Sequence, residues 1–189
     1  MSSLAVAPPS RQELEAVFAV LGSYHLHLLG DASLADPDFP ADALLRLRNG
    51  IITVDLEREA LVARREERVL GVSCWTWLDE AAAAAKTVLI AVTPEARGLG
   101  VGAALQAARM RAMWDAGAET IHTWSDDPAA IAWYERHFGY ERAGEEPIRH
   151  ALHRFRWGRE SWWGIHRGFP ERTTLTHLVA RQPATQRQP

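Results

Sequence analysis

The spacing of apolar and polar residues divides the chain into short strands and a few helices. Apolar positions at helical spacing predict a first helix from Arg11 to about Leu21, opened by a capping box of Ser10 and Glu13. A second short helix is expected from Ala41 to Arg48, after a loop from Gly30 to Pro40.

Runs rich in β-branched and aromatic residues predict most of the remaining elements to be strands. These strands are Leu4–Ala7, the antiparallel hairpin Ala60–Arg64 and Val69–Trp77, then Thr87–Val92, Thr120–Trp124, His150–Trp157 and Thr173–Ala180. Residues 24–29 are ambiguous, and Ile51–Leu56 fits either a strand or a connector. Ala81–Ala85 and Gly158–Arg172 are expected to be connections between strands.

A glycine-rich turn separates the strand Thr87–Val92 from a long Ala-rich helix, predicted from about Leu99 to Ala116. The expected buried stripe of this helix is Val101, Leu105, Ala108 and Ala112. A turn of this kind presents free backbone N–H groups at a helix N-terminus, where the helix dipole favours a phosphate. Arg97 adds a forked cation suited to phosphate oxygens.

Two phosphate-binding patterns fit this turn. Gly98-x-Gly100-x-x-Ala103 matches the dinucleotide fingerprint, but Thr93–Arg97 lies between the strand and the first glycine, where that fold leaves almost no residues. The longer pattern Val92-x-Pro94-x-x-Arg97-x-x-Gly100-x-Gly102-x-x-Leu105 resembles the signature of the GNAT superfamily of acyl-CoA-dependent N-acetyltransferases. A ligand-free turn is the third interpretation.

A second motif, Asp126 to Tyr140, supports the same resemblance. It reads as a helix with Asp127 as N-cap, Pro128 in the first turn and Gly139 at its end. It also resembles the GNAT pattern N-P-x-A-x-x-x-Y-x-x-x-G-F, with Tyr134 at the tyrosine position. Two departures are Asp127 in place of Asn and one extra residue between Tyr134 and Gly139.

The resemblance implies an α/β (α+β) fold: one domain over residues 1–181, with a mixed, mostly antiparallel central sheet flanked by helices. The tail 182–189, rich in Gln and Pro, is expected to be disordered. The resemblance also implies the cofactor-binding residues. The backbone of Ile90, Ala91 and Val92 would pair with the pantetheine arm, and Asp127 stands where relatives contact the cofactor. The expected pyrophosphate-binding residues are Arg97, Gly98, Leu99, Gly100, Val101, Gly102 and Ala103.

Two residues are candidates for proton transfer. Tyr134 matches the tyrosine that lies near the thioester sulfur in many relatives, where it would protonate the leaving thiolate; the alternative is a half-buried core aromatic. The strand Thr87–Val92 carries no carboxylate to act as general base. His122 on the neighbouring strand is a candidate base, directly or through water; the alternative is a hydrogen-bonded structural residue.

The acceptor site is expected near the connector 158–172. Its Trp162 and Trp163 would form an aromatic wall, with His166 and Arg167 orienting a polar amine, and Trp75 is included in the same candidate site. The alternatives are a homodimer contact or a hydrophobic loop packed on the sheet.

Composition excludes few functions. A net charge of −3 gives no global case for nucleic-acid binding. Cys74 is the only cysteine, so it forms no intrachain disulfide and is expected to be a small buried residue. The histidines are scattered and predict no metal site. The absence of a signal peptide or a membrane-length apolar run predicts a cytoplasmic protein.

The expected function is transfer of an acetyl or other short acyl group from acyl-CoA to a primary amine by direct attack. The cosubstrate is acetyl-CoA or another acyl-CoA, without a metal. The aromatic connector favours a small-molecule acceptor. Three alternatives are a protein or peptide N-acetyltransferase, an enzyme using a longer or carrier-bound donor, and a non-catalytic acyl-CoA-binding module.

Overall fold

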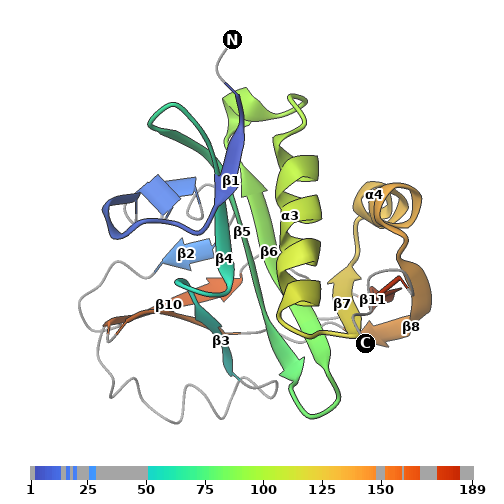
Figure 1. Ribbon diagram of the computed structural model, residues 1–189. Coiled ribbons are helices and arrows are strands. Elements are labelled where there is room, and N and C mark those ends of the chain that lie inside the picture. Colours follow the sequence, from blue (N-terminus) through green and yellow to red (C-terminus); the bar gives the residue numbers. More distant parts are fainter. Residues whose placement is uncertain are drawn as a thin grey trace.

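Two β-sheets and two long α-helices make up the described part of the chain (Figure 1). The computed structural model describes residues 3–13, 16–17, 19–20, 26–28, 51–147, 152–158, 160–166 and 174–183. The strands are β1 (Ala5–Ala7), β2 (Leu26–Leu28), β3 (Ile51–Asp55), β4 (Ala60–Arg65), β5 (Arg68–Asp79), β6 (Ala84–Val92), β7 (Thr120–Ser125), β8 (Glu141–Pro147), β9 (Leu152–Trp157), β10 (Glu160–His166) and β11 (Thr174–Arg181). The helices are the short 3-10 turns η1 (Arg11–Glu13) and η3 (Pro94–Ala96) and the α-helices α3 (Val101–Asp115) and α4 (Pro128–Phe138).

The larger sheet contains seven of the described strands, in the order β1-β4-β5-β6-β7-β11-β8. Neighbouring strands run antiparallel except β6 and β7, which confirms the predicted mixed, mostly antiparallel sheet. β6 and β7 pair only at their N-terminal ends, Ala84–Lys86 with Thr120–His122. Beyond these pairs the backbone ladder stops: a hydrogen bond of 2.6 Å joins the Thr87 and Thr123 hydroxyls, and the two strands then separate (Figure 1). We call the separated parts, Thr87–Val92 and Thr123–Ser125, the fork.

Both long helices lie on one face of this sheet. α3 packs against β4, β5 and β6, and α4 packs against β7 and β11. Gly71 allows α3 to come close, because a Cβ there would lie 2.7 Å from the Ala91 carbonyl oxygen and 3.0 Å from the Leu105 side chain. The predicted signals of α4 are confirmed: the Asp127 carboxylate accepts from the Ala129 N–H at 2.8 Å, and Gly139 ends the helix with φ 66°.

The smaller sheet has the order β2-β10-β9-β3 and contacts the larger one through β3 and β5. Val54, Phe155 and Trp157 from the smaller sheet are buried in one cluster with Val72 and Cys74 of β5. Residues 72 and 74 alternate with Gly71, which faces α3, so this cluster lies on the opposite face of the larger sheet.

The connector predicted over 158–172 is wrong for residues 160–166, which form β10 and pair with β9 and β2. Two residues join β9 to β10, and Gly158 has a φ of 55°. Tight hairpin turns require such a conformation. The sequence prediction treated the aromatic run as a loop because its two adjacent Trp residues and a glycine break the alternation expected of a strand.

Two other elements differ from prediction. β8 was not predicted, because Glu141–Pro147 lacks alternating apolar residues; among the described strands it pairs with β11 and forms the sheet edge, where charged residues are common. β6 begins at Ala84 rather than Thr87, since Ala84 and Ala85 are buried between β5 and β7. Ile51–Leu56, left open between strand and connector, contains β3.

The first helix, predicted from Arg11 to about Leu21, is a 3-10 turn at Arg11–Glu13 and is helical at residues 16, 17, 19 and 20; its other residues lie outside the described part. β1 and the hairpin β4–β5 lie where expected, and the Ser10 N–H donates to the Glu13 carboxylate at 2.6 Å, as in a capping box. The predicted loop 30–40, the second helix 41–48 and residues 184–189 of the tail lie outside the described residues. Within the described part, no helix is long and apolar enough to cross a membrane.

Candidate active site

The glycine-rich turn leads from the end of β6 through η3 into α3. Gly98 and Gly100 have φ values of 76° and 78°, which L side chains adopt at a cost, and Gly100 is the N-cap of α3. The N-cap has no side chain to accept from the first helical N–H groups. Among the described residues, none accepts from the N–H groups of Val101, Gly102 or Ala103. These three donors are therefore available to a ligand.

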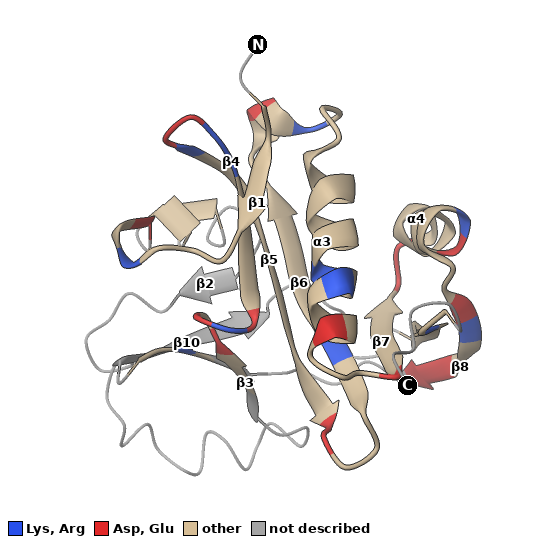
Figure 2. Cartoon of the chain, viewed as in Figure 1, with Lys and Arg blue, Asp and Glu red and all other residues tan. Residues whose placement is uncertain are grey.

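The surroundings of these donors fit an anionic ligand. Arg97, Gly98, Leu99 and Gly100 are exposed, and the first turn of α3 has no acidic residue. Figure 2 shows that α3 carries no charged side chain before its middle. A Cβ at Gly102 would meet only Val92 Cγ2, at an ordinary 3.7 Å, so packing among the described residues does not require glycine there. The turn can therefore hold a pyrophosphate against its backbone.

The β6 side of the fork presents backbone groups. The Thr93 N–H donates to the Leu70 carbonyl at 2.9 Å. This bond shows which β6 residues near it direct their backbone groups toward β5 and which direct them away. Ile90 and Val92 consequently direct their N–H and C=O groups away from β5 and toward the fork. The prediction that Ile90–Val92 binds an extended ligand stays a prediction, but this geometry suits it.

Tyr134 lies on α4 and is 7% exposed. Its ring packs edge-on against Tyr140, with 5.1 Å between ring centroids. Its hydroxyl has no hydrogen-bond partner among the described residues. The hydroxyl is also not one of the fully buried polar atoms, so its oxygen is accessible. The phenol therefore combines a core ring with an accessible oxygen, and its role as a proton donor stays a prediction.

Trp75 and Asp127 have clear structural roles. Trp75 is 4% exposed and packs in the core beneath the helices, edge-on to Trp77. Its ring offers a substrate almost no surface. The Asp127 carboxylate caps α4, so it already accepts a hydrogen bond from one backbone N–H.

His122 has both ring nitrogens engaged. Nδ1 lies 2.9 Å from His177 Nε2, and Nε2 lies 3.1 Å from Thr120 Oγ1. Burial is the main factor that lowers the pKa of His122, and His177 and Arg181 lower it further. A neutral ring pair of this kind can pass a proton through either partner. His177 was not singled out from sequence, because only the pairing of β7 with β11 brings it to His122.

A polar row surrounds this histidine pair. Thr76, Lys86 and His122 are cross-strand neighbours on the face opposite the helices. The Lys86 ammonium lies 4.7 Å from the ring centroid of Trp124, and that ring stacks on His177 at 4.4 Å. Burial lowers the pKa of Lys86, although Glu146 opposes this shift.

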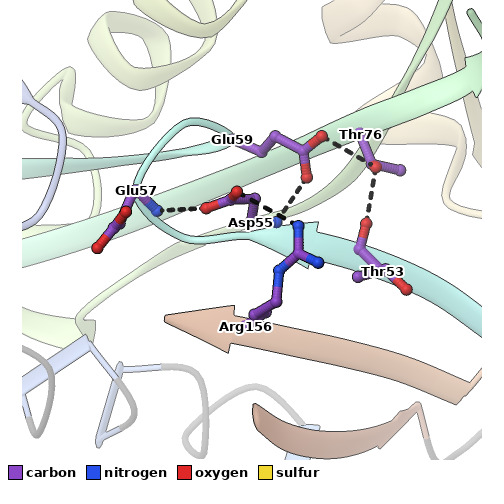
Figure 3. A network of polar contacts seen from close by, with 6 residues as sticks. All are labelled: Thr53, Asp55, Glu57, Glu59, Thr76 and Arg156. Carbon is purple, nitrogen blue, oxygen red and sulfur yellow. Dashed lines mark hydrogen bonds and ion pairs between the residues drawn. The ribbon is translucent and has the colours of Figure 1, made fainter. Parts of the chain in front are cut away.

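Glu59 is a second candidate base that sequence analysis missed. Its carboxylate accepts from the Asp55 N–H at 2.6 Å and from Thr76 Oγ1 at 3.3 Å (Figure 3). Burial, as the largest cause, raises its pKa to about 7. In the sequence Glu59 belongs to the acidic turn 55–59, which is typical of solvent-exposed loops. Only the packing of that turn against β5 and β9 desolvates the carboxyl group.

The predicted acceptor residues Trp162, Trp163 and His166 lie in β10, in the smaller sheet. The orientations of their side chains, and the position of Arg167, lie outside what the structure describes. Across the described residues, no three His, Cys, Asp or Glu side chains gather in a way that could hold a metal ion. Cys74 is buried as predicted, and burial raises its thiol pKa to about 12.

Solved structures share this fold at low sequence identity. An N-acetyltransferase from Staphylococcus aureus Mu50 is 14% identical, with a TM-score of 0.59, and the match covers 95% of this chain and 99% of that one. A ribosomal-protein-alanine N-acetyltransferase from Brucella melitensis is 16% identical, with a TM-score of 0.61 and coverage of 94% and 99%. The Salmonella typhimurium protein yncA, solved with its cofactor acetyl-CoA, is 12% identical, with a TM-score of 0.61 and coverage of 96% and 95%.

No curated protein matches the chain. The family model described as the acetyltransferase (GNAT) family matches residues 27–140, more than half of the chain. This range includes the fork, the glycine-rich turn and α4, the elements that carry both sequence motifs. The chain belongs to the acetyltransferase (GNAT) family.

Proposed function

We propose that the protein transfers an acetyl or other short acyl group from acyl-CoA to a primary amine of a small molecule, by direct attack of the amine. The observation that carries this proposal is the set of N–H donors at Val101–Ala103, which have no acceptor among the described residues and follow the part of β6 that does not pair with β7. An anion site next to an edge that can pair with an extended arm fits the two ends of an acyl-CoA.

Each part of the chain has a distinct task in this proposal. Gly98–Ala103 and Arg97 hold the pyrophosphate, and Ile90–Val92 align the pantetheine arm. Acyl-CoA supplies the thioester that the amine attacks. An N–H of the fork edge donates to the carbonyl oxygen as it gains charge, and the Tyr134 hydroxyl protonates the leaving thiolate.

The amine must lose a proton before it attacks. His122 can take that proton only through a group that already contacts it, either Thr120 or His177. Its lowered pKa keeps the imidazole neutral near pH 7, as a base requires. Glu59, with a pKa of about 7, is the other group on this face suited to the task.

The small-molecule acceptor is the finer part of the proposal. It is supported by the aromatic residues Trp162 and Trp163 of β10 and by Trp124 beside the fork. The Brucella melitensis protein of the same fold is a ribosomal-protein-alanine N-acetyltransferase, so a peptide acceptor is the outcome that would contradict this choice.

The test measures release of the CoA thiol from acetyl-CoA with a panel of amino acids, polyamines, aminoglycosides, arylamines and short peptides. Release with one class of small amine, and formation of its acetyl amide by mass spectrometry, supports the proposal. Release with peptides alone would show that the acceptor is a peptide and not a small-molecule amine. Failure to bind acetyl-CoA or longer acyl-CoAs by calorimetry would overturn the assignment of the turn.

A further inference from the structure

Arg109 is the largest fully buried side chain among the described residues, at 0% exposure. It lies on α3 in line with Val101, Leu105 and Met113, so a cation occupies the middle of an apolar stripe. Ala108 and Ala112 of the predicted stripe are partly buried and pack against the cluster that contains Val101 and Leu105, whereas Arg109 and Met113 are fully buried. Burying a charge in a core is costly unless its hydrogen-bond partners are well placed.

The guanidinium binds backbone oxygens of two strands. Arg109 Nη1 donates to the Leu89 carbonyl of β6 at 2.5 Å and to the Cys74 carbonyl of β5 at 3.1 Å. Its Nη2 donates to Gln106 Oε1. None of these acceptors is a carboxylate, so the hydrogen-bond partners of the positively charged guanidinium are all neutral.

The two carbonyls lie at an irregularity in the sheet. Cys74 pairs with Leu89, but the next residue, Trp75, pairs with Thr87, which leaves Val88 as an extra residue in β6. Such a β-bulge bends its strand and disturbs the local ladder. β6 also stops pairing with β7 here, after Lys86. Arg109 thus clamps the bulge at which the fork opens.

The same side chain connects to α4 through a buried network. Gln106 Nε2 donates to Tyr140 Oη at 3.2 Å, and the Tyr140 ring packs on the Tyr134 ring. Arg109 therefore contacts the strand edge and, through two residues, the element that carries Tyr134. The proposed reaction requires these two parts to keep a fixed position relative to each other.

We propose that Arg109 is a positioning residue that fixes the β6 bulge, and with it the direction of the Ile90 and Val92 backbone groups toward the acyl donor. This inference rests on the proposed function for its kinetic consequences, but not for its structural one. A hydrophobic side chain of similar length would fill the same space without holding the carbonyls. Because the acceptors of Arg109 are neutral, Arg109→Met leaves no unpaired charge in the core, so loss of position can be separated from loss of fold.

The test compares Arg109→Met with Arg111→Met, which removes an exposed arginine from the same helix. Hydrogen exchange of the segment 87–92, measured without ligand, should become roughly tenfold faster in Arg109→Met and remain unchanged in the control. Acetyl-CoA should bind more weakly, with kcat lowered about 100-fold, while the thermal midpoint stays within a few degrees of wild type. Arg109→Lys should restore part of each property, because an ammonium can still donate to a carbonyl.

The outcomes separate the two proposals. Faster exchange in Arg109→Met, with no acyl-CoA binding even by the wild type, would retain the clamp and reject the proposed function. Wild-type exchange and wild-type kinetics in a folded Arg109→Met would overturn the positioning role. If Arg109→Met does not fold, Arg109→Lys is the deciding variant. Hydrogen exchange and kinetics equal to those of wild type would show that a buried positive charge is sufficient. That result would reject a clamp that depends on the guanidinium.

Discussion

The two faces of the larger sheet are built in different ways. On the helix face, the glycine-rich turn and the fork edge present backbone groups from one continuous segment, residues 87–103. On the opposite face, the ionisable groups are side chains from distant segments, such as Glu59, His122 and His177. A backbone site is recognisable as a local motif, whereas a side-chain site depends on which strands pair. Four substitutions test this difference.

The largest effect is expected from a negative charge placed on the backbone site. Ala103→Glu puts a carboxylate in the first turn of α3, where it would repel a pyrophosphate and weaken acetyl-CoA binding on the order of 1,000-fold. Ala107→Glu, one turn further along and also exposed, is the matched control. Calorimetric titration measures both. Equal affinities in the two variants would place the anion elsewhere.

The next effect concerns Tyr134. Removing its hydroxyl in Tyr134→Phe leaves the ring against Tyr140 but takes away the proton donor, so kcat should fall about 100-fold with little change in acetyl-CoA affinity. Steady-state kinetics with the preferred amine, alongside a thermal melt, measure this split. Full turnover would reduce Tyr134 to a packing residue.

A smaller loss is expected for Arg97. Its guanidinium is exposed and supplements backbone donors, so Arg97→Ala should weaken acetyl-CoA binding about tenfold and leave the fold intact. Because the contact is electrostatic, the difference from wild type should shrink as salt is raised. An unchanged dissociation constant at low salt would remove Arg97 from the site.

The smallest effect probes the side-chain face. The raised pKa means that the folded protein keeps the Glu59 proton up to about pH 7, whereas the unfolded chain loses it near pH 4.5, the ordinary pKa of glutamate. Stability therefore falls as pH rises through this window, and Glu59→Gln should remove that part of the decline. Allowing for solvent screening of a partly exposed group, the variant should gain about 1 kcal/mol above pH 7.

Urea denaturation at several pH values measures this gain. Glu57→Gln, an exposed neighbour in the same turn, should keep the wild-type pH dependence. Parallel curves for wild type and Glu59→Gln would contradict the burial of the Glu59 carboxyl group, whose hydrogen bonds are drawn in Figure 3.

The sequence alone indicated the family and the order of the central strands along the chain, and it supplied the hypothesis for the cofactor site. These rest on local rules: periodicity marks the strand before the glycine-rich turn and the helix after it, and capping chemistry marks both ends of α4. Such rules act within a few residues, so no tertiary information is needed to apply them.

The tertiary structure decided what the local pattern could not contain. Arg109 lies in the core, although its residue type predicts an exposed position, because two bulge carbonyls and Gln106 accept from its Nη groups; its Nε has no partner among the described residues. β10 is a strand because β9 and β2 supply its hydrogen-bond partners. Glu59 has a raised pKa because β5 and β9 bury its turn. In each case the free energy comes from contacts between segments that are far apart in sequence, and single-segment propensity does not include those contacts.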